Sequence, residues 1–136
     1  MADGRFFPPP QPGDIVWCRM PDEIGAPPSK ARPALVIATG EIEGKAAARV
    51  AYGTSQKVDR LHAGEFSVRQ NDGDAYLAAG LSVSTKFNLK RSVELPYNDV
   101  WFAVAPGAPF GQTPKLGLLH PMLMRRAHAA SRAAEN

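Results

Sequence analysis

The sequence has little cysteine and no long hydrophobic run. Cys18 is its single cysteine, so it cannot form an internal disulfide, and three scattered histidines do not complete the ligand spacing of a zinc site. No apolar stretch approaches the roughly 20 residues that cross a bilayer. The N-terminus also lacks the apolar core of a signal peptide. These absences predict a soluble, cytoplasmic protein without a membrane segment.

Recognisable cofactor motifs are also missing. The sequence contains no P-loop, no dinucleotide-binding fingerprint and no nucleophile elbow. We therefore expect any chemistry to proceed without a metal or a cofactor.

A strong charge excess is absent as well. The chain carries 16 Lys and Arg against 13 Asp and Glu, a formal net charge of +3. The excess lies in the last 25 residues, which hold Lys115, Arg125, Arg126 and Arg132 against Glu135. This charge permits a nucleic-acid partner and does not by itself indicate one, because phosphate binding needs a local positive patch.

What the sequence does contain is proline, concentrated at the start. Eight of the 13 prolines fall within the first 33 residues, which predicts an extended, proline-rich arm over residues 1–12. A length of 136 residues suits a single domain, expected over residues 13–136.

Short runs rich in β-branched and aromatic residues follow the arm. The first three, Ile15–Arg19, Pro33–Thr39 and Ala47–Thr54, are joined by short loops and predict an antiparallel meander. Further predicted strands are Phe66–Val68, Ala75–Leu77, Leu81–Asn88 and Ser92–Leu95. An amphipathic helix is expected over about 121–134, with Pro121 in its first turn. The fold class is therefore mostly β with a C-terminal helix.

Two neighbouring strand ends carry candidate site residues. Arg32 precedes Pro33, which favours an extended backbone, and Thr54 closes the next strand. In an antiparallel pair, those two ends lie at the same edge, where an arginine and a hydroxyl form a phosphate clamp. Taken singly, Arg32 also suits a solvated strand start and Thr54 a turn cap.

These residues belong to a wider pattern. Gly13–Trp17, then Arg32–Val36, then Gly53–Ser55 resemble the PemK/MazF family of bacterial toxins in order and approximate spacing. The resemblance implies an SH3-like β-barrel that forms a homodimer, cleaves single-stranded RNA and is inhibited by a cognate antitoxin, with which it binds DNA. It also implies a cleavage that needs no metal: the RNA's own 2′-hydroxyl attacks and leaves a 2′,3′-cyclic phosphate and a 5′-hydroxyl.

The resemblance also assigns roles to residues. By position, Arg32 matches the family's catalytic arginine and Thr54 its catalytic threonine. Side chains expected to bind substrate are Ser55, Gln56, Lys57, Thr85 and Lys86. Arg91 is a further candidate for a phosphate contact, whereas Trp17 and Phe87 are expected in the core.

The general base is not assigned by this pattern. Some family members carry an acidic residue on a later strand, but Leu81–Phe87 contains no carboxylate, and residues 22–31 contain no histidine. Asp59 and His62, just after the Thr-Ser element, are the candidate bases, since imidazole is suited to proton transfer near neutral pH.

Two alternatives to the ribonuclease toxin follow. The missing carboxylate favours a catalytically degenerate relative that binds RNA or a partner protein. A gyrase poison like the CcdB toxins is disfavoured, because the chain ends in Ala-Ala-Glu-Asn rather than in an aromatic, apolar segment. We also hypothesise that Arg125, Arg126 and Arg132 hold an acidic antitoxin segment.

Overall fold

The computed structural model describes residues 4–135 and consists mainly of one antiparallel sheet. Its six strands are β1 (Asp14–Cys18), β2 (Arg32–Ile42), β3 (Lys45–Thr54), β4 (Glu65–Val68), β5 (Thr85–Pro96) and β6 (Lys115–Leu118). Their order across the sheet is β4-β5-β3-β2-β1-β6. The predicted meander of the first three strands is confirmed by the pairing of β1 with β2 and of β2 with β3.

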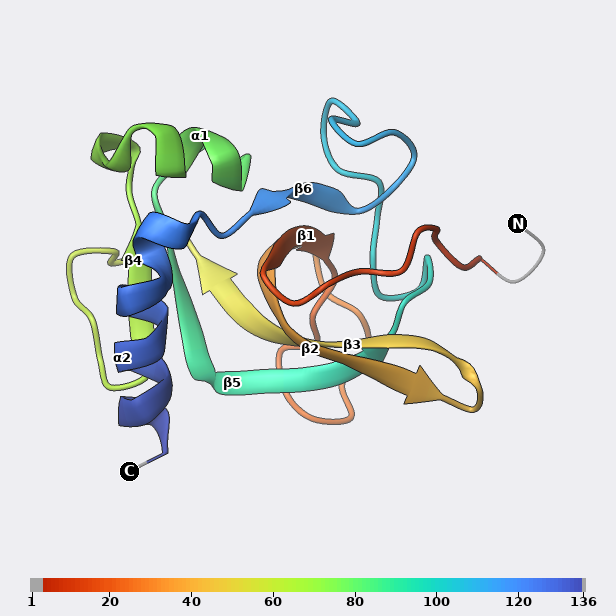
Figure 1. Cartoon of the computed structure of the whole chain (residues 1–136). Helices are drawn as coiled ribbons and strands as arrows, with labels where there is room; N and C mark the ends of the chain where they lie inside the picture. The colour runs from red at the N-terminus through yellow and green to blue at the C-terminus, as the bar shows by residue number, and fades with distance from the viewer. Residues whose placement is uncertain (1–3, 136) are drawn as a thin grey trace.

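The expected mostly β fold with a C-terminal helix is confirmed, and its sheet is open. Within the described residues, β4 and β6 form the two edges of the sheet and do not pair with each other. The sheet is therefore not closed into the SH3-like β-barrel that the resemblance implies. Figure 1 shows the helix α2 (Met124–Ala134) beside β4 and β5 at one end of the molecule and the N-terminal arm at the other.

The alternation of side chains along the strands builds a core on both faces of the sheet. On β1, Ile15 belongs to one cluster of buried residues and Val16 to the other. On β2, Leu35 joins the cluster of Ile15, and Val36 that of Val16. Because both faces are covered, these strands are nearly continuous apolar runs in the sequence.

One predicted strand was wrong, and two others are parts of a single strand. Ala75–Leu77 lies in a short helix, α1 (Asp74–Ala79), which follows a 3₁₀ turn at Gln70–Asp72. Ala75 and Ala79, one helical turn apart, are buried there. Leu81–Asn88 and Ser92–Leu95 are not separate strands, since β5 is continuous from Thr85 to Pro96 and residues 81–84 precede it.

The sequence interpretation missed β6. This strand, Lys-Leu-Gly-Leu, lacks the β-branched residues that indicate strands. Its Gly117 permits a close approach to α1, because a Cβ at that position would overlap the backbone carbonyls of Ala78 and Ala79. Tertiary packing, rather than local propensity, therefore explains β6.

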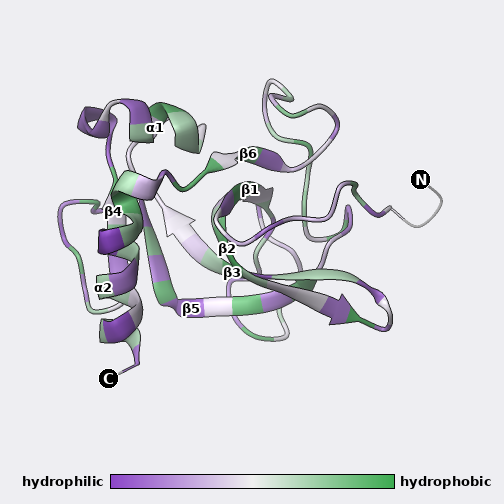
Figure 2. Cartoon of the chain, in the orientation of Figure 1, coloured by the Kyte–Doolittle hydropathy of each residue, from purple (hydrophilic) through white to green (hydrophobic). Residues whose placement is uncertain are grey.

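The C-terminal helix agrees with its prediction. A 3₁₀ turn at Pro121–Leu123 leads into α2, and Leu123, Ala127 and Ala130 are buried against the sheet. Arg125, His128 and Arg132 are exposed. Figure 2 shows the resulting alternation of hydrophilic and hydrophobic bands along α2.

The N-terminal arm is attached to the segment after β5. The Phe6 N–H donates to the carbonyl of Tyr97 over 3.4 Å, and the Asp99 N–H donates to that of Gly4 over 2.8 Å. The rings of Phe6 and Tyr97 meet edge to face at 5.9 Å, and Pro10 is buried. The arm is therefore held on the folded body at Gly4, Phe6 and Pro10, whereas residues 7–9 are exposed.

Candidate functional site

A groove of about 410 Å³ opens where β2 begins and β3 ends. Its walls come from β1, from the loop before β2, from the end of β3 and from the segment leading into β5. The lining residues are Trp17, Lys30, Ala31, Arg32, Pro33, Gly53, Thr54, Ser55, Gln56, Ser82, Val83 and Thr85. Arg32 and Thr54 thus lie in one groove.

The antiparallel register brings these two residues together. Ala34 on β2 pairs with Tyr52 on β3. Arg32 lies two residues before Ala34 and Thr54 two residues after Tyr52, so in an antiparallel pair both lie toward the same end of the sheet. Between them, Gly53 allows a close approach of the strands: a Cβ there would overlap the carbonyl oxygen of Pro33. The register of β2 and β3 therefore brings Arg32 and Thr54 to the same end of the sheet.

The Arg32 guanidinium is held at its tip. Its Nη1 donates a hydrogen bond of 2.9 Å to the hydroxyl of Tyr52, although the side chain as a whole is exposed. Arginine keeps its charge at every physiological pH and offers several further N–H donors. Arg32 can therefore bind an anionic oxygen in the groove while one of its donors stays engaged.

Thr54 has a local partner as well. Its Oγ1 accepts the backbone N–H of Gln56 over 3.1 Å, which is the turn-capping arrangement. A hydroxyl that accepts one bond still carries its own O–H donor. Capping therefore fixes the position of the hydroxyl without using its proton.

The predicted substrate-binding residues separate into two groups. Ser55, Gln56 and Thr85 line the groove, and Lys57 is exposed directly after them. Lys86 is buried on the neighbouring strand, where its Nζ donates to Glu65 Oε1 over 3.0 Å and to the Arg60 carbonyl over 2.8 Å. Lys86 is therefore engaged inside the protein rather than placed in the groove.

The two candidate bases lie outside the groove lining, in the loop after β3. Asp59 is exposed, and its carboxylate is 2.6 Å from Arg69 Nη1. His62 is exposed too, and its backbone N–H donates to Glu65 Oε1 over 2.7 Å. Burial alone would raise the pKa of Glu65, but the His62 N–H and the Lys86 ammonium outweigh it and hold that pKa below its ordinary value.

The structure adds residues that sequence reasoning placed elsewhere or passed over. Trp17, assigned to the core, packs against one core cluster and also lines the groove. Lys30 lines it two residues before Arg32, and Ser82 and Val83 line it from the segment before β5. The position of Lys30, two residues before Arg32, could have indicated that it lines the same groove. The position of residues 82–83 beside the groove depends on the tertiary fold and has no such local signal.

Phe87 lies in the interior, as expected, and so does Cys18. Phe87 is fully buried and packs against Phe66, with ring centroids 5.7 Å apart. Cys18 is buried, and that burial raises the pKa of its thiol to about 12. A thiol protonated at neutral pH is not a nucleophile.

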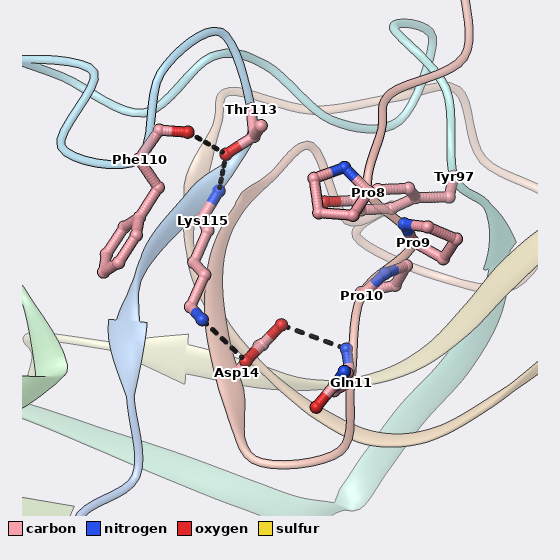
Figure 3. A pocket seen from close by; sticks show the side chains of 9 residues that line it. All are labelled: Pro8, Pro9, Pro10, Gln11, Asp14, Tyr97, Phe110, Thr113 and Lys115. Atoms are coloured by element: carbon pink, nitrogen blue, oxygen red, sulfur yellow. Dashed lines mark hydrogen bonds and ion pairs between the residues drawn. The ribbon is translucent and has the colours of Figure 1, made fainter.

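A second cavity, of about 340 Å³, lies between the N-terminal arm and the segments around Tyr97 and Phe110 (Figure 3). Asp14 accepts the Gln11 N–H and pairs with Lys115, whose Nζ lies 3.4 Å from Asp14 Oδ1 and 4.7 Å from the Phe110 ring centroid. None of its described lining residues belongs to the groove of Arg32 and Thr54.

Metal-binding clusters and membrane-spanning helices are both absent from residues 4–135. This part of the chain has no group of three or more His, Cys, Asp or Glu side chains arranged to hold a metal ion. It also has no helix with the length and apolarity that a membrane span requires.

Comparison with known proteins adds one match. The family described as PemK-like, MazF-like toxin of type II toxin-antitoxin systems matches residues 11–91. No curated protein matches the chain. The matched range contains the whole lining of the groove, whereas the arm before Gln11, β6 and α2 lie outside it.

Proposed function

This chain belongs to the PemK-like, MazF-like toxin family of type II toxin-antitoxin systems, and we propose that it is an endoribonuclease that cleaves single-stranded RNA. The observation that carries the proposal is the groove in which Arg32 and Thr54 lie at adjoining strand ends. Membership of a type II family implies an antitoxin as partner. We further propose that the toxin is a homodimer.

In the proposed reaction, the RNA supplies its own nucleophile. The 2′-hydroxyl oxygen attacks the adjacent phosphorus, and the bond from phosphorus to the 5′-oxygen breaks. The departing 5′-oxygen takes up a proton from water, so the products are a 2′,3′-cyclic phosphate and a 5′-hydroxyl. Arg32 stabilises the negative charge that builds on the phosphorane oxygens, and Thr54 donates to a non-bridging oxygen. A preorganised donor of this kind contributes about 3 kcal/mol of transition-state stabilisation.

The groove also offers contacts for the rest of the strand. Lys30 and Lys57 are exposed cations at its margin, and the exposed Ser55 and Gln56 provide polar groups close to the proposed reacting phosphate. Thr85 also lines the groove, but it is only 1% exposed and its hydroxyl donates to the Val83 carbonyl over 3.0 Å. Trp17 gives an aromatic surface on which an unpaired base can stack, as single-strand RNA readers use. These contacts favour a single strand over a duplex, whose bases are not accessible for stacking.

The proton of the 2′-hydroxyl needs an acceptor. No carboxylate or imidazole is among the described residues that line the groove, and Asp59 is already paired with Arg69. Of the two candidates, we assign the role of base to His62, which is exposed in the loop after Thr54. The absence of a base from the lining also supports a second candidate function, RNA binding without cleavage.

The test is incubation of a long single-stranded RNA with the purified protein in excess chelator, followed by mapping of the ends. Discrete cuts with 5′-hydroxyl ends are expected, reduced about a hundredfold or more in Arg32→Ala and Thr54→Ala. Arg49→Ala is the control, because Arg49 is exposed on β3 outside the groove.

The other outcomes separate the alternatives. Salt-dependent RNA binding that needs Arg32, with no cleavage, would establish the RNA-binding function instead. Equal cleavage by the wild type and Arg32→Ala would contradict the proposed site. A His62→Gln variant with an unchanged pH-rate profile would remove His62 as the base.

A further inference from the structure

Tyr52 lies between two arginines beside the groove. Its hydroxyl accepts Arg32 Nη1 over 2.9 Å, and the guanidinium carbon of Arg91 lies 4.2 Å from the centroid of its ring. We propose that Tyr52 and Arg91 are positioning residues that orient the Arg32 guanidinium for its work on RNA. This inference rests on the proposed role of Arg32.

The position of Arg91 is set by an irregularity in β5. Ala51 and Tyr52 are consecutive on β3, yet their partners on β5 are Ser92 and Asn88, so the three residues 89–91 have no counterpart in the register. Bulges of this kind bend a strand and redirect its side chains. Here the bulge ends at Arg91, which reaches over the ring of Tyr52.

Arg91 also connects β5 to the loop that delivers Arg32. Its Nη2 donates to the carbonyl of Asp22 over 2.5 Å. Within that loop, Ser29 Oγ donates to the Met20 carbonyl over 2.5 Å, which draws the two ends of residues 20–29 together. The backbone leading into Arg32 and the tip of its side chain are thus held by one connected set of contacts.

The effect of these contacts is entropic. An exposed arginine has many rotamers, and the entropy lost when its side chain is restricted opposes RNA binding unless the fold has already restricted it. The hydrogen bond from Arg32 to the Tyr52 hydroxyl restricts the Arg32 side chain to a subset of its rotamers before RNA binds. Misplacement of a reacting group by about 1 Å can cost on the order of a hundredfold in rate.

Tyr52 is not among the residues that line the groove, so its action passes through Arg32. Its ring also contacts Arg91, whose guanidinium carbon lies 4.2 Å from the ring centroid. Arg91 contacts the ring face, where a cation is attracted by the π electrons. The sequence suggested that Arg91 contacts a phosphate. In the structure its guanidinium packs on the ring of Tyr52 instead.

The first measurement does not need catalysis. We expect ¹⁵N NMR of wild-type protein to show separate Nη signals for a restricted Arg32 guanidinium, identified by comparison with Arg32→Lys. Tyr52→Phe, which removes only the hydroxyl, should average those signals, and Tyr76→Phe on α1 should leave them separate. Arg91→Met is the second variant, expected to weaken the restriction while the hydroxyl is retained.

The second measurement is kinetic. Tyr52→Phe should lower kcat for RNA cleavage by about tenfold to a hundredfold and change KM by less than about twofold, since the group acts through orientation. Arg32 signals that do not respond to Tyr52→Phe or Arg91→Met overturn the inference. Signals that respond in a protein without ribonuclease activity leave the positioning intact and reject the proposed function.

Discussion

Gly53 and Pro33 face each other across β2 and β3 at such close range that a Cβ on Gly53 would overlap the Pro33 carbonyl oxygen. The same Cβ would lie 2.9 Å from Cε1 of Phe87, which is fully buried. Because Gly53 stands between Tyr52 and Thr54, and Pro33 follows Arg32, this contact sets the separation of the groove's two central residues. The glycine is required for lack of space, not for an unusual backbone angle.

Gly53→Ala is expected to reduce RNA cleavage at least tenfold and to destabilise the fold by about 1–3 kcal/mol, the range for overpacking a filled site. The added methyl group must push β3 away from the Pro33 carbonyl, and Thr54 moves with it. Cleavage rates and urea denaturation measure the two effects.

The control is Gly40→Ala on β2, where a new Cβ would meet only the Glu94 carboxylate at 3.4 Å. This variant should keep the wild-type cleavage rate and nearly the wild-type stability. Full activity in Gly53→Ala would show that the spacing of β2 and β3 does not control the groove.

Lys86 and Glu65 provide a prediction about stability. Their side chains are only 8% and 9% exposed, and Nζ lies 3.0 Å from Oε1. Glu65→Gln leaves a buried ammonium without its counter-charge, so the free energy of unfolding should fall by about 3 kcal/mol. Adding Lys86→Met to the Glu65→Gln variant should restore part of the lost stability, as measured by chemical denaturation.

Glu94→Gln serves as the comparison, because Glu94 is exposed on β5. It should change stability by less than about 0.5 kcal/mol. If Glu65→Gln were no more destabilising than Glu94→Gln, Lys86 would be free to leave its partner, and its assignment to RNA would be open again.

The parts of the fold that sequence predicted are those with a local signal. β1, β2 and β3 are apolar runs bounded by prolines and a short turn, and α2 has both a proline start and a helical period. β6 and α1 carry weak local signals: β6 depends on Gly117 fitting against α1, and Ala75–Leu77 is as apolar as a strand of its length. Their structure follows from packing that no short window contains.

The candidate site divides in the same way. Arg32 and Thr54 could be placed together from the sequence, because antiparallel pairing of consecutive strands determines which ends meet. The partners of Lys86 and Arg91 could not, since one depends on β4 pairing with β5 and the other on the bulge at residues 89–91. Lysine and arginine have long, flexible side chains, so the position of the residue on a strand does not determine where its charged group lies.

Arg126 gives the last prediction, and it revises the hypothesis that a basic face of α2 is available to an acidic segment. Arg126 donates through Nη1 and Nη2 to both oxygens of Asp72, each over 2.8 Å. This bond is the main cause that lowers the pKa of Asp72; burial opposes it and the Arg69 N–H assists. Of the three arginines, Arg126 is therefore already paired, and it joins α2 to the turn before α1.

A carboxyl whose pKa is lowered on folding stabilises the fold above its ordinary pKa, and this contribution disappears as the pH falls through the folded-state value. Asp72→Asn should therefore lower the free energy of unfolding by about 1 kcal/mol at pH 7, because Arg126 is 45% exposed and solvent screens the pair. As the pH falls below the folded-state pKa of Asp72, the variant and the wild type should converge. Urea denaturation across this range, with exposed Glu41→Gln running parallel to the wild type, measures the difference. A constant gap between Asp72→Asn and the wild type at every pH would show that Asp72 acts only as a cap for the Arg69 N–H, and the charge pair with α2 would contribute nothing.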